Sequence, residues 1–329
     1  MPKIGGGAVR VTILVSGMCA CQRRYTPGMM PPYVFPSDLP PSLRLLAAVW
    51  AAMVGAVLGS FLNVVIARVP AGKSIVRPGS RCPGCGTPIA WYDNIPVLSF
   101  LLLRARCRAC HRPISWRYPL VEVLGVGAAL LAFQRHGLSL SALAELCLLC
   151  LLLALTFIDI DTWLLPYPLT LPLLGTGLFA SAFHLSMARS FTSALLGAAI
   201  GGGVFFAVSF VGEKLLRKEA LGLGDVWLLA GIGAWLGARA LIPVVLLASL
   251  QGALWGVGQL LAGKGQKGAP AEEAGRGKRE ALGASGGEEE WVPPRHAVPF
   301  GPFLAAGALE WLYLALPLSR VVVLFQPFT

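Results

Sequence analysis

The sequence predicts an all-α polytopic membrane protein of about eight transmembrane helices, with a small metal-binding domain between the first two. Three observations lead to this fold class. Of the 329 residues, 56% are hydrophobic and only 13% are charged, and the mean hydropathy is +0.69. Long apolar stretches recur along the whole chain, and two tight pairs of cysteines follow the first of them. This pattern excludes a water-soluble fold around one core, a disordered chain and a fibrous chain.

Residues 1–40 are expected to form a flexible extension. They are rich in proline, and their one apolar run, at 11–15, is too short to cross a bilayer. They also lack a convincing secretory signal. Initiation near Met29 or Met30 is an alternative start.

The first long apolar stretch, 45–66, has 22 residues, enough at about 1.5 Å per residue to cross a hydrocarbon core of about 30 Å. Seven further spans meet the same criterion, at about 119–134, 141–158, 169–187, 193–212, 225–238, 240–262 and 298–317. The chain therefore divides into the extension (1–40), a first transmembrane helix (41–67), a cytoplasmic domain (68–118), a transmembrane core (119–262), a flexible cytoplasmic loop (263–297), and a last transmembrane helix with a tail (298–329).

The basic residues predict the orientation of these spans. Eighteen of the 27 lysines and arginines lie in three segments, 68–117, 214–218 and 264–295, and only three lie in the alternate loops. With eight spans the three segments fall on one side, which the positive-inside rule identifies as the cytoplasm, so both termini lie outside. The net charge of +11 therefore reflects orientation in a lipid bilayer, and we expect no nucleic-acid partner.

Four cysteines in the cytoplasmic domain predict a zinc site. Cys82 and Cys85 form one Cys-x-x-Cys pair, Cys107 and Cys110 form another, and 21 residues separate the pairs. This spacing is close to that of a structural site with four thiolates, which leaves no open coordination position for catalysis. The alternative, two redox dithiols or free thiols, is disfavoured in a reducing cytoplasm.

Three other potential ligands have simpler interpretations. Cys147 and Cys150 lie among leucines, where thiols pack as small hydrophobic groups. His111 follows the second cysteine pair and could replace a thiolate, but an exposed or hydrogen-bonding role is favoured.

Carboxylates at the ends of apolar stretches are the strongest candidates for chemistry, because ionisable groups at membrane depth mark functional sites. Asp159 and Asp161 end the third predicted span, and Asp225 begins the sixth, after Gly222 and Gly224. The predicted topology places both ends on the cytoplasmic side, so carboxylates distant in sequence can meet at one depth. The two glycines lack Cβ atoms and would let a substrate backbone approach Asp225.

Such a pair suits aspartic proteolysis. Two carboxyl groups in a confined site share one proton, so one draws a proton from the attacking water while the other polarises the peptide carbonyl. Asp159 and Asp161 are about 200° apart on a helix, so at most one faces Asp225, and the pattern alone does not choose. The alternative is structural, with Asp159 a solvated helix end and Asp225 an N-cap.

Seven motifs follow one another in a fixed order. They are 59–70, the two cysteine pairs with 94–96 between them, 117–122, 158–166, 169–172, 222–225 and 299–303. Together they resemble the type IV prepilin peptidases, the Gly-x-Gly-Asp membrane aspartic proteases that process pilins and type II secretion pseudopilins. The resemblance covers nearly all of residues 55–310.

The resemblance implies that Asp159 and Asp225 are the catalytic pair, with Gly222, Gly224 and Asp161 in support. It also implies zinc on the four cysteines, which are Cys82, Cys85, Cys107 and Cys110. Two departures from the family pattern alter the charge near the pair: Tyr167 stands where an Asp is usual, and Trp227 where a Lys is usual.

The resemblance further implies a bifunctional enzyme of the inner (cytoplasmic) membrane. Its active site faces the cytoplasm, where it cuts the short basic leader of prepilins and pseudopilins after a glycine. It then methylates the new N-terminal residue with S-adenosylmethionine, for which Glu122 and Asp93 are candidate contacts. With Trp227 in place of the usual Lys, the methylation step can differ.

Two alternatives remain open. A presenilin-type protease would have Tyr rather than Ile158 before the first Asp, and a Pro-Ala-Leu motif after Asp225, which is absent here. A non-enzymatic transporter subunit would relay ions through buried carboxylates, but no inverted repeat is visible.

Overall fold

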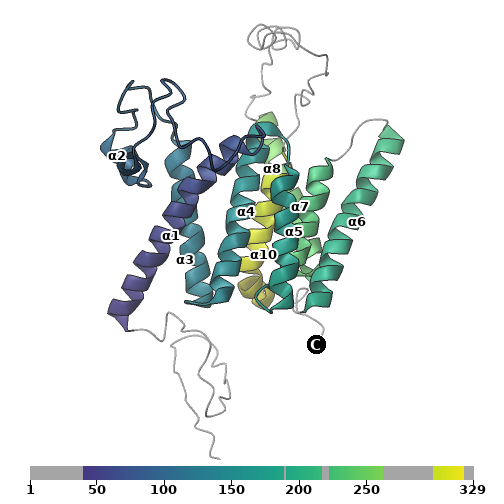
Figure 1. Ribbon diagram of the computed structural model, residues 1–329. Helices are drawn as coiled ribbons and strands as arrows, with labels where there is room; N and C mark the ends of the chain where they lie inside the picture. Colours follow the sequence, from purple (N-terminus) through teal and green to yellow (C-terminus); the bar gives the residue numbers. More distant parts are fainter. Residues whose placement is uncertain (1–39, 189, 217–221, 262–298, 322–329) are drawn as a thin grey trace, which may run out of the picture.

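The computed structural model describes residues 40–188, 190–216, 222–261 and 299–321. Within these ranges the fold is helical (Figure 1), and each predicted span coincides with a long helix whose bounds differ by a few residues. The long helices are α1 (Pro41–Arg68), α3 (Arg117–His136), α4 (Leu140–Thr162), α5 (Tyr167–Ala182), α6 (Phe191–Leu216), α7 (Leu223–Leu236), α8 (Ala238–Leu261) and α10 (Gly301–Val321). The expected flexible extension, the loop 263–297 and the tail after 321 lie outside the described residues.

Four of the described helices are long and apolar enough to cross a membrane: α1, α4, α6 and α8. Helix α7 is apolar but has only 14 residues, which span about 21 Å at 1.5 Å per residue. These helices indicate that the chain is a membrane protein. The arrangement of eight spans stays a prediction.

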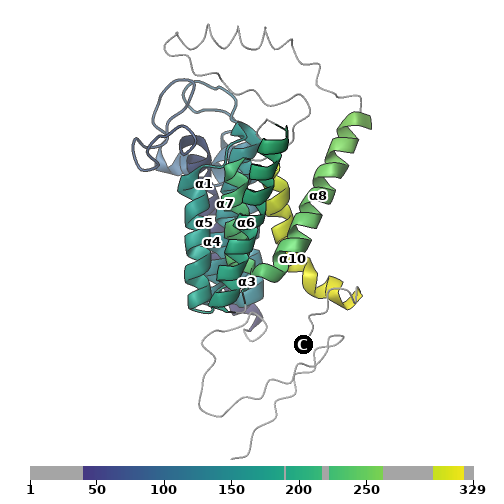
Figure 2. The same ribbon diagram turned by 90° about the vertical axis from the view of Figure 1, so that its right-hand side faces the viewer.

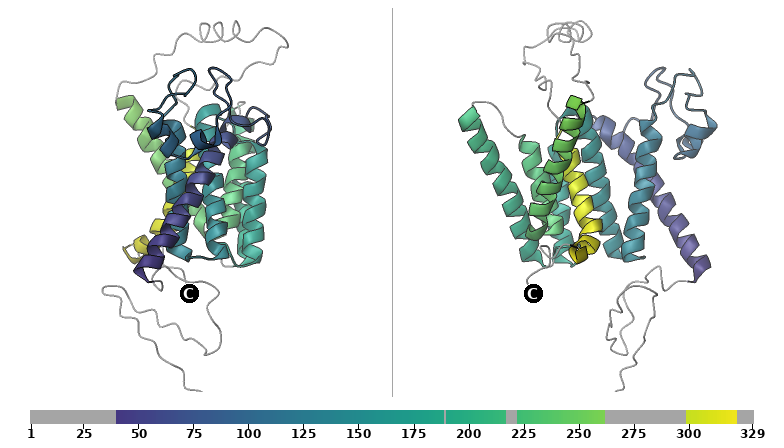
Figure 3. Two further views of the ribbon diagram at one scale, coloured as in Figure 1. Left: turned by 60° about the vertical axis from the view of Figure 1, so that its left-hand side comes forward. Right: turned by 180° about the vertical axis from the view of Figure 1, so that it is seen from behind.

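The long helices lie side by side and alternate in direction (Figures 1 and 3). The same end of the bundle therefore holds the last turns of α1 and α4 and the first turns of α3, α7 and α10, and we call it the site end. Helix α8 leans away from the other helices towards the site end (Figure 2).

Small residues let neighbouring helices approach closely. A Cβ atom on Gly59 of α1 would lie 2.6 Å from the Cα atom of Glu122 on α3, and one on Gly201 of α6 would lie 2.7 Å from the Leu229 carbonyl oxygen on α7. Packing of this kind drives helix association in lipid, where apolar burial alone gives little gain. Helices α5 and α7 are further joined by the buried Trp235 indole, which donates to the Leu173 carbonyl at 3.0 Å.

The segment between α1 and α3 projects from the site end as a small domain. It contains two short helical segments that the sequence did not predict, η2 (Trp91–Asn94) and α2 (Leu98–Leu102). Helix α2 lies beside the upper ends of α1 and α3, on the outer flank of the bundle (Figures 1 and 3).

Candidate active site and metal centre

Asp159 lies in the last turn of α4. The helix begins at the N-cap Ser139, whose hydroxyl accepts from the Ala142 amide at 3.2 Å, and it ends at Trp163, which adopts the left-handed conformation. The Asp159 side chain is buried, with 5% of the residue exposed. Its Oδ2 atom accepts a hydrogen bond from the backbone amide of Gly301 at 3.0 Å. The alternative interpretation of Asp159 as a solvated helix end is therefore wrong.

Gly301 is a residue of the candidate site that the sequence analysis did not single out. It begins α10, and a Cβ atom at this position would lie 2.6 Å from Asp159 Oδ2. Only glycine therefore allows the amide to approach the carboxylate this closely. The available signal was a glycine between Pro299 and Pro302 at the start of the last span, which was noted only as part of a motif.

Asp225 lies in the first turn of α7. The N-cap of this helix is Gly222, so the alternative interpretation of Asp225 as the N-cap is wrong. The Asp225 amide donates to the Gly222 carbonyl at 3.0 Å, and a Cβ atom on Gly222 would lie 3.8 Å from Asp225 Oδ2. A side chain at position 222 would therefore contact the carboxylate, and glycine leaves that side of Asp225 uncovered.

Gly224 has a different role from Gly222. A Cβ atom on Gly224 would lie 2.6 Å from the Cβ atom of Leu165, in the connection between α4 and α5. The missing side chain lets the start of α7 pack directly against the chain that follows Asp159. The carboxylates of Asp159 and Asp225 lie close enough for their charges to interact.

Asp161 has a different partner from Asp159. It forms an ion pair with Arg117, at the start of α3. The same guanidinium donates to the Phe157 carbonyl at 3.1 Å and lies 5.1 Å from the centre of the Phe157 ring. Asp161 therefore ties α4 to α3, and of the two aspartates on α4 it is Asp159 that approaches Asp225.

The two candidate contacts for a methyl donor both have partners within the protein. The side chain of the domain residue Asp93 is only 11% exposed and receives two hydrogen bonds from Arg108, at 2.7 and 2.5 Å. These bonds hold the pKa of Asp93 below its usual range. Glu122 is buried in α3 and accepts from the Val97 amide at 2.7 Å, so it fixes the small domain to the bundle.

The four cysteines of the small domain form a cluster that fits a metal ion. Their sulfur atoms all lie within 4.8 Å of one another, and the Cys82 and Cys110 sulfurs are 3.8 Å apart. Zinc–sulfur bonds of about 2.3 Å at tetrahedral angles place two sulfurs about 3.8 Å apart, so this donor set suits zinc. Thr87 lowers the pKa of Cys85 to about 6 through a hydrogen bond, which favours the thiolate that binds metal.

The two cysteine pairs adopt the same local fold. In the first, the Cys82 amide donates to the Thr87 carbonyl at 3.0 Å; in the second, the Cys107 amide donates to the Arg112 carbonyl at 2.9 Å. The residue after each pair has a positive φ, +72° at Gly86 and +55° at His111. His111 is exposed and lies outside the cysteine cluster, so its position is explained by the turn.

Two family models match the chain. Residues 53–136 match the Bacterial Peptidase A24 N-terminal domain, and residues 146–257 match the Type IV leader peptidase family. The first covers α1, the small domain and α3. The second covers the segment that contains Asp159 and Asp225.

Curated relatives are similar over most of the chain. A prepilin leader peptidase/N-methyltransferase of Myxococcus xanthus is 44% identical over 322 residues, covering 87% of this chain and 96% of the relative. Proteins of the same name from Klebsiella pneumoniae (46% identity, 59% of this chain and 87% of the relative) and Burkholderia pseudomallei (35% identity, 85% and 88%) also match. No solved structure matches the chain.

Proposed function

The chain belongs to the type IV leader peptidase family, and we propose that it is a membrane aspartic endopeptidase that removes the leader of type IV prepilins and pseudopilins. Its second activity is N-methylation of the residue that cleavage exposes, with S-adenosylmethionine as the methyl donor. The relatives carry both activities in their name, and this chain has both domains of the family.

One observation carries the peptidase proposal. Asp159 lies in the last turn of α4 and Asp225 in the first turn of α7, and although 65 residues separate them in sequence, both lie at the site end, close enough for their charges to interact. One carboxylate takes a proton from a water molecule as that water attacks the peptide carbonyl. The other, protonated, donates a hydrogen bond to the carbonyl oxygen, and the first carboxylate then returns the proton it took to the leaving amine.

Two glycines complete the proposed geometry. The Gly301 amide fixes one oxygen of Asp159, which leaves its second oxygen for water or for Asp225. Gly222 leaves room beside Asp225 for an extended substrate backbone. Asp161 supports the site indirectly, because its ion pair with Arg117 fixes the last turn of α4.

The metal is structural in this proposal. Four thiolates fill the tetrahedral coordination of zinc, so the ion would hold the two cysteine turns together and would not contact substrate. We assign no residue to the methyl donor, because Asp93 and Glu122 are both occupied by hydrogen bonds within the protein.

The orientation follows from charge. The end of α1, the small domain and the first turn of α3 together carry nine of the lysines and arginines, at the same end as the aspartates. By the positive-inside rule we propose that this end faces the cytoplasm, and that the membrane is the inner membrane, where a prepilin leader would be exposed before export.

Mass spectrometry of a prepilin's N-terminus, from cells with and without this gene, tests both activities. We expect a cut, methylated N-terminus only in cells that carry the gene. An intact leader in both strains would contradict the peptidase. A cut but unmethylated N-terminus would limit the chain to proteolysis, and Trp227→Lys would then test whether this departure from the family pattern is the cause.

A further inference from the structure

The small domain exposes large apolar side chains, although it lies outside the helical bundle. On α2, Leu101 and Leu102 are 62% and 72% exposed. Ser99 and Phe100 of the same helix are buried. Trp91 and Trp116 are 82% and 73% exposed. Exposed tryptophan and leucine side chains near basic residues are typical of segments that lie in a membrane interface.

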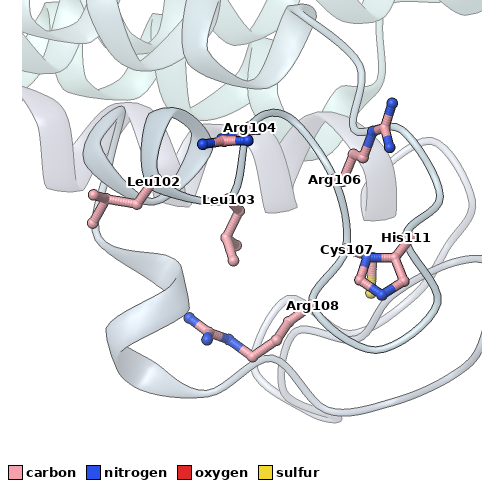
Figure 4. A pocket seen from close by; sticks show the side chains of 7 residues that line it. All are labelled: Leu102, Leu103, Arg104, Arg106, Cys107, Arg108 and His111. Atoms are coloured by element: carbon pink, nitrogen blue, oxygen red, sulfur yellow. The ribbon is translucent and has the colours of Figure 1, made fainter.

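A basic hollow adjoins one of these side chains, Leu102. It has a volume of about 500 Å³ and runs from the end of α2 to the second cysteine pair (Figure 4). Arg108, which lines it, is already paired with Asp93. Among the described residues no acidic side chain pairs with Arg104 or Arg106, which are both exposed.

The position of this surface relative to the bundle matters. Helix α2 lies on the outer flank of the bundle, level with the ends of α1 and α3 (Figures 1 and 3). These two helices end and begin at Arg68 and Arg117, residues that belong at the headgroup level of a bilayer. We therefore expect the exposed leucines of α2 to lie at the level where lipid begins.

We propose that the four-cysteine domain binds anionic lipid headgroups through this surface, which consists of α2, Arg104 and Arg106. The leucines of α2 enter the interface, and the two guanidinium groups contact phosphate oxygens of the same leaflet. The positive charge of this surface determines which ligands it attracts. A methyl donor with a sulfonium cation, or a basic leader, would be repelled by unpaired arginines, whereas an anionic headgroup is attracted.

Binding of the domain to lipid headgroups would assist the proposed peptidase, although the inference does not depend on that function. It would hold the domain at a fixed height beside the site end, adding to the hydrogen bonds that Glu122 of α3 and Arg68 of α1 make with the domain.

Hydrogen–deuterium exchange of the full-length protein tests the proposal, in nanodiscs of phosphatidylcholine with and without phosphatidylglycerol. We expect slower exchange of residues 98–112 when the anionic lipid is present, and loss of this difference at high salt. Arg104→Gln and Arg106→Gln should each lower the protection roughly fivefold, and the double variant roughly 25-fold. Arg239→Gln, an exposed arginine that begins α8 at the opposite end, is the matched control and should change nothing.

Three results would overturn the proposal. The first is equal exchange in both lipid compositions. The second is protection by inorganic phosphate alone in neutral nanodiscs, which would indicate a site for a soluble anion. The third is protection in neutral nanodiscs that disappears when Glu288, Glu289 and Glu290 are changed to Gln, which would assign the hollow to the chain's own acidic run. Metal content, measured for every variant, shows whether the cysteine cluster has stayed intact.

Discussion

At the scale of single residues, the site depends on where backbone amides and missing side chains lie. Asp159 is held by an amide from α10, a helix that begins 142 residues later. An amide donor fixes the direction of a carboxylate without adding a charge that would compete with its partner. The position of Gly301 is therefore as specific to this site as that of the aspartates.

Gly301→Ala tests this arrangement. The added Cβ atom would lie 2.6 Å from Asp159 Oδ2, so the carboxylate or the start of α10 must move. We expect leader cleavage to fall about 10²-fold or more, since small displacements of a catalytic group have effects of this size. Gly127→Ala is the matched control, because a Cβ atom at Gly127 on α3 meets nothing within 4 Å. Equal activity of the two variants in a cleavage assay would contradict the role of Gly301.

The sequence predicted part of this residue-level picture. The angle of about 200° between Asp159 and Asp161 on a helix indicated that they face different ways. In the structure they do, because Asp161 pairs with Arg117 and Asp159 contacts Gly301. The sequence could not identify these partners, because each lies at least 44 residues away and only packing of the helices brings them close.

At the scale of elements, the small domain has little apolar core of its own. Among its residues 69–116, only Cys82, Ser99 and Phe100 are buried. Small domains of this kind depend on a staple, and a bound metal contributes directly to their folding.

Changing both Cys82 and Cys107 to Ser tests the staple. We expect the purified wild type to contain one zinc ion per chain and the double variant to contain none, with its 69–116 segment cut readily by protease. Cys147→Ser with Cys150→Ser is the matched control, since these thiols lie in α4 away from the cluster, and should keep the metal. A metal-free wild type with a protected domain would contradict the zinc assignment.

A second group of charges joins three helices at the end of the bundle opposite the site. Glu145 of α4 is 2% exposed and lies 2.5 Å from His136 Nε2 at the end of α3. It also accepts from the Tyr313 hydroxyl of α10. Arg135, 3.9 Å from Glu145, donates to the Leu312 carbonyl at 2.7 Å. This cluster fixes α10, the helix that carries Gly301.

Glu145→Gln is expected to destabilise the protein. The change removes the charge that the partly buried His136 and Tyr313 contact, at a cost of about 1–3 kcal/mol. The readout is a lower Tm in thermal unfolding of the purified protein. Glu310→Gln is the control, because Glu310 is only partly buried and its partner, Gln251, can also bond an amide. Equal Tm values for both variants and the wild type would show that the cluster adds no stability.

At the scale of the whole molecule, charge and hydropathy predicted the sequence of helices but not their packing. Each predicted span coincides with a helix because long apolar stretches have no other stable structure in lipid. The contacts between helices depend on glycines such as Gly59 and Gly201, and on the Trp235 indole. A single sequence does not show which helix faces which glycine. The sequence could therefore predict that α4, α7 and α10 have ends on the same side of the membrane, but not that these ends contact one another.

The predicted orientation can be measured with reporter fusions. Alkaline phosphatase, which is active outside the cytoplasm, should be active when fused after Leu138, between α3 and α4, and inactive when fused after Lys73 in the small domain. The opposite pattern would reverse the topology and would place the aspartates on the outer face.

The most direct test of the central claim is the cleavage rate of purified Asp159→Asn, Asp225→Asn and the double variant on one prepilin. Two carboxylates that act as a unit on one water lose nearly everything when either is changed, so each single variant should fall roughly 10²- to 10⁴-fold. The double variant should be no slower than the slower single one. A single variant that cuts at the wild-type rate, or losses that multiply in the double variant, would show that these two aspartates do not act together.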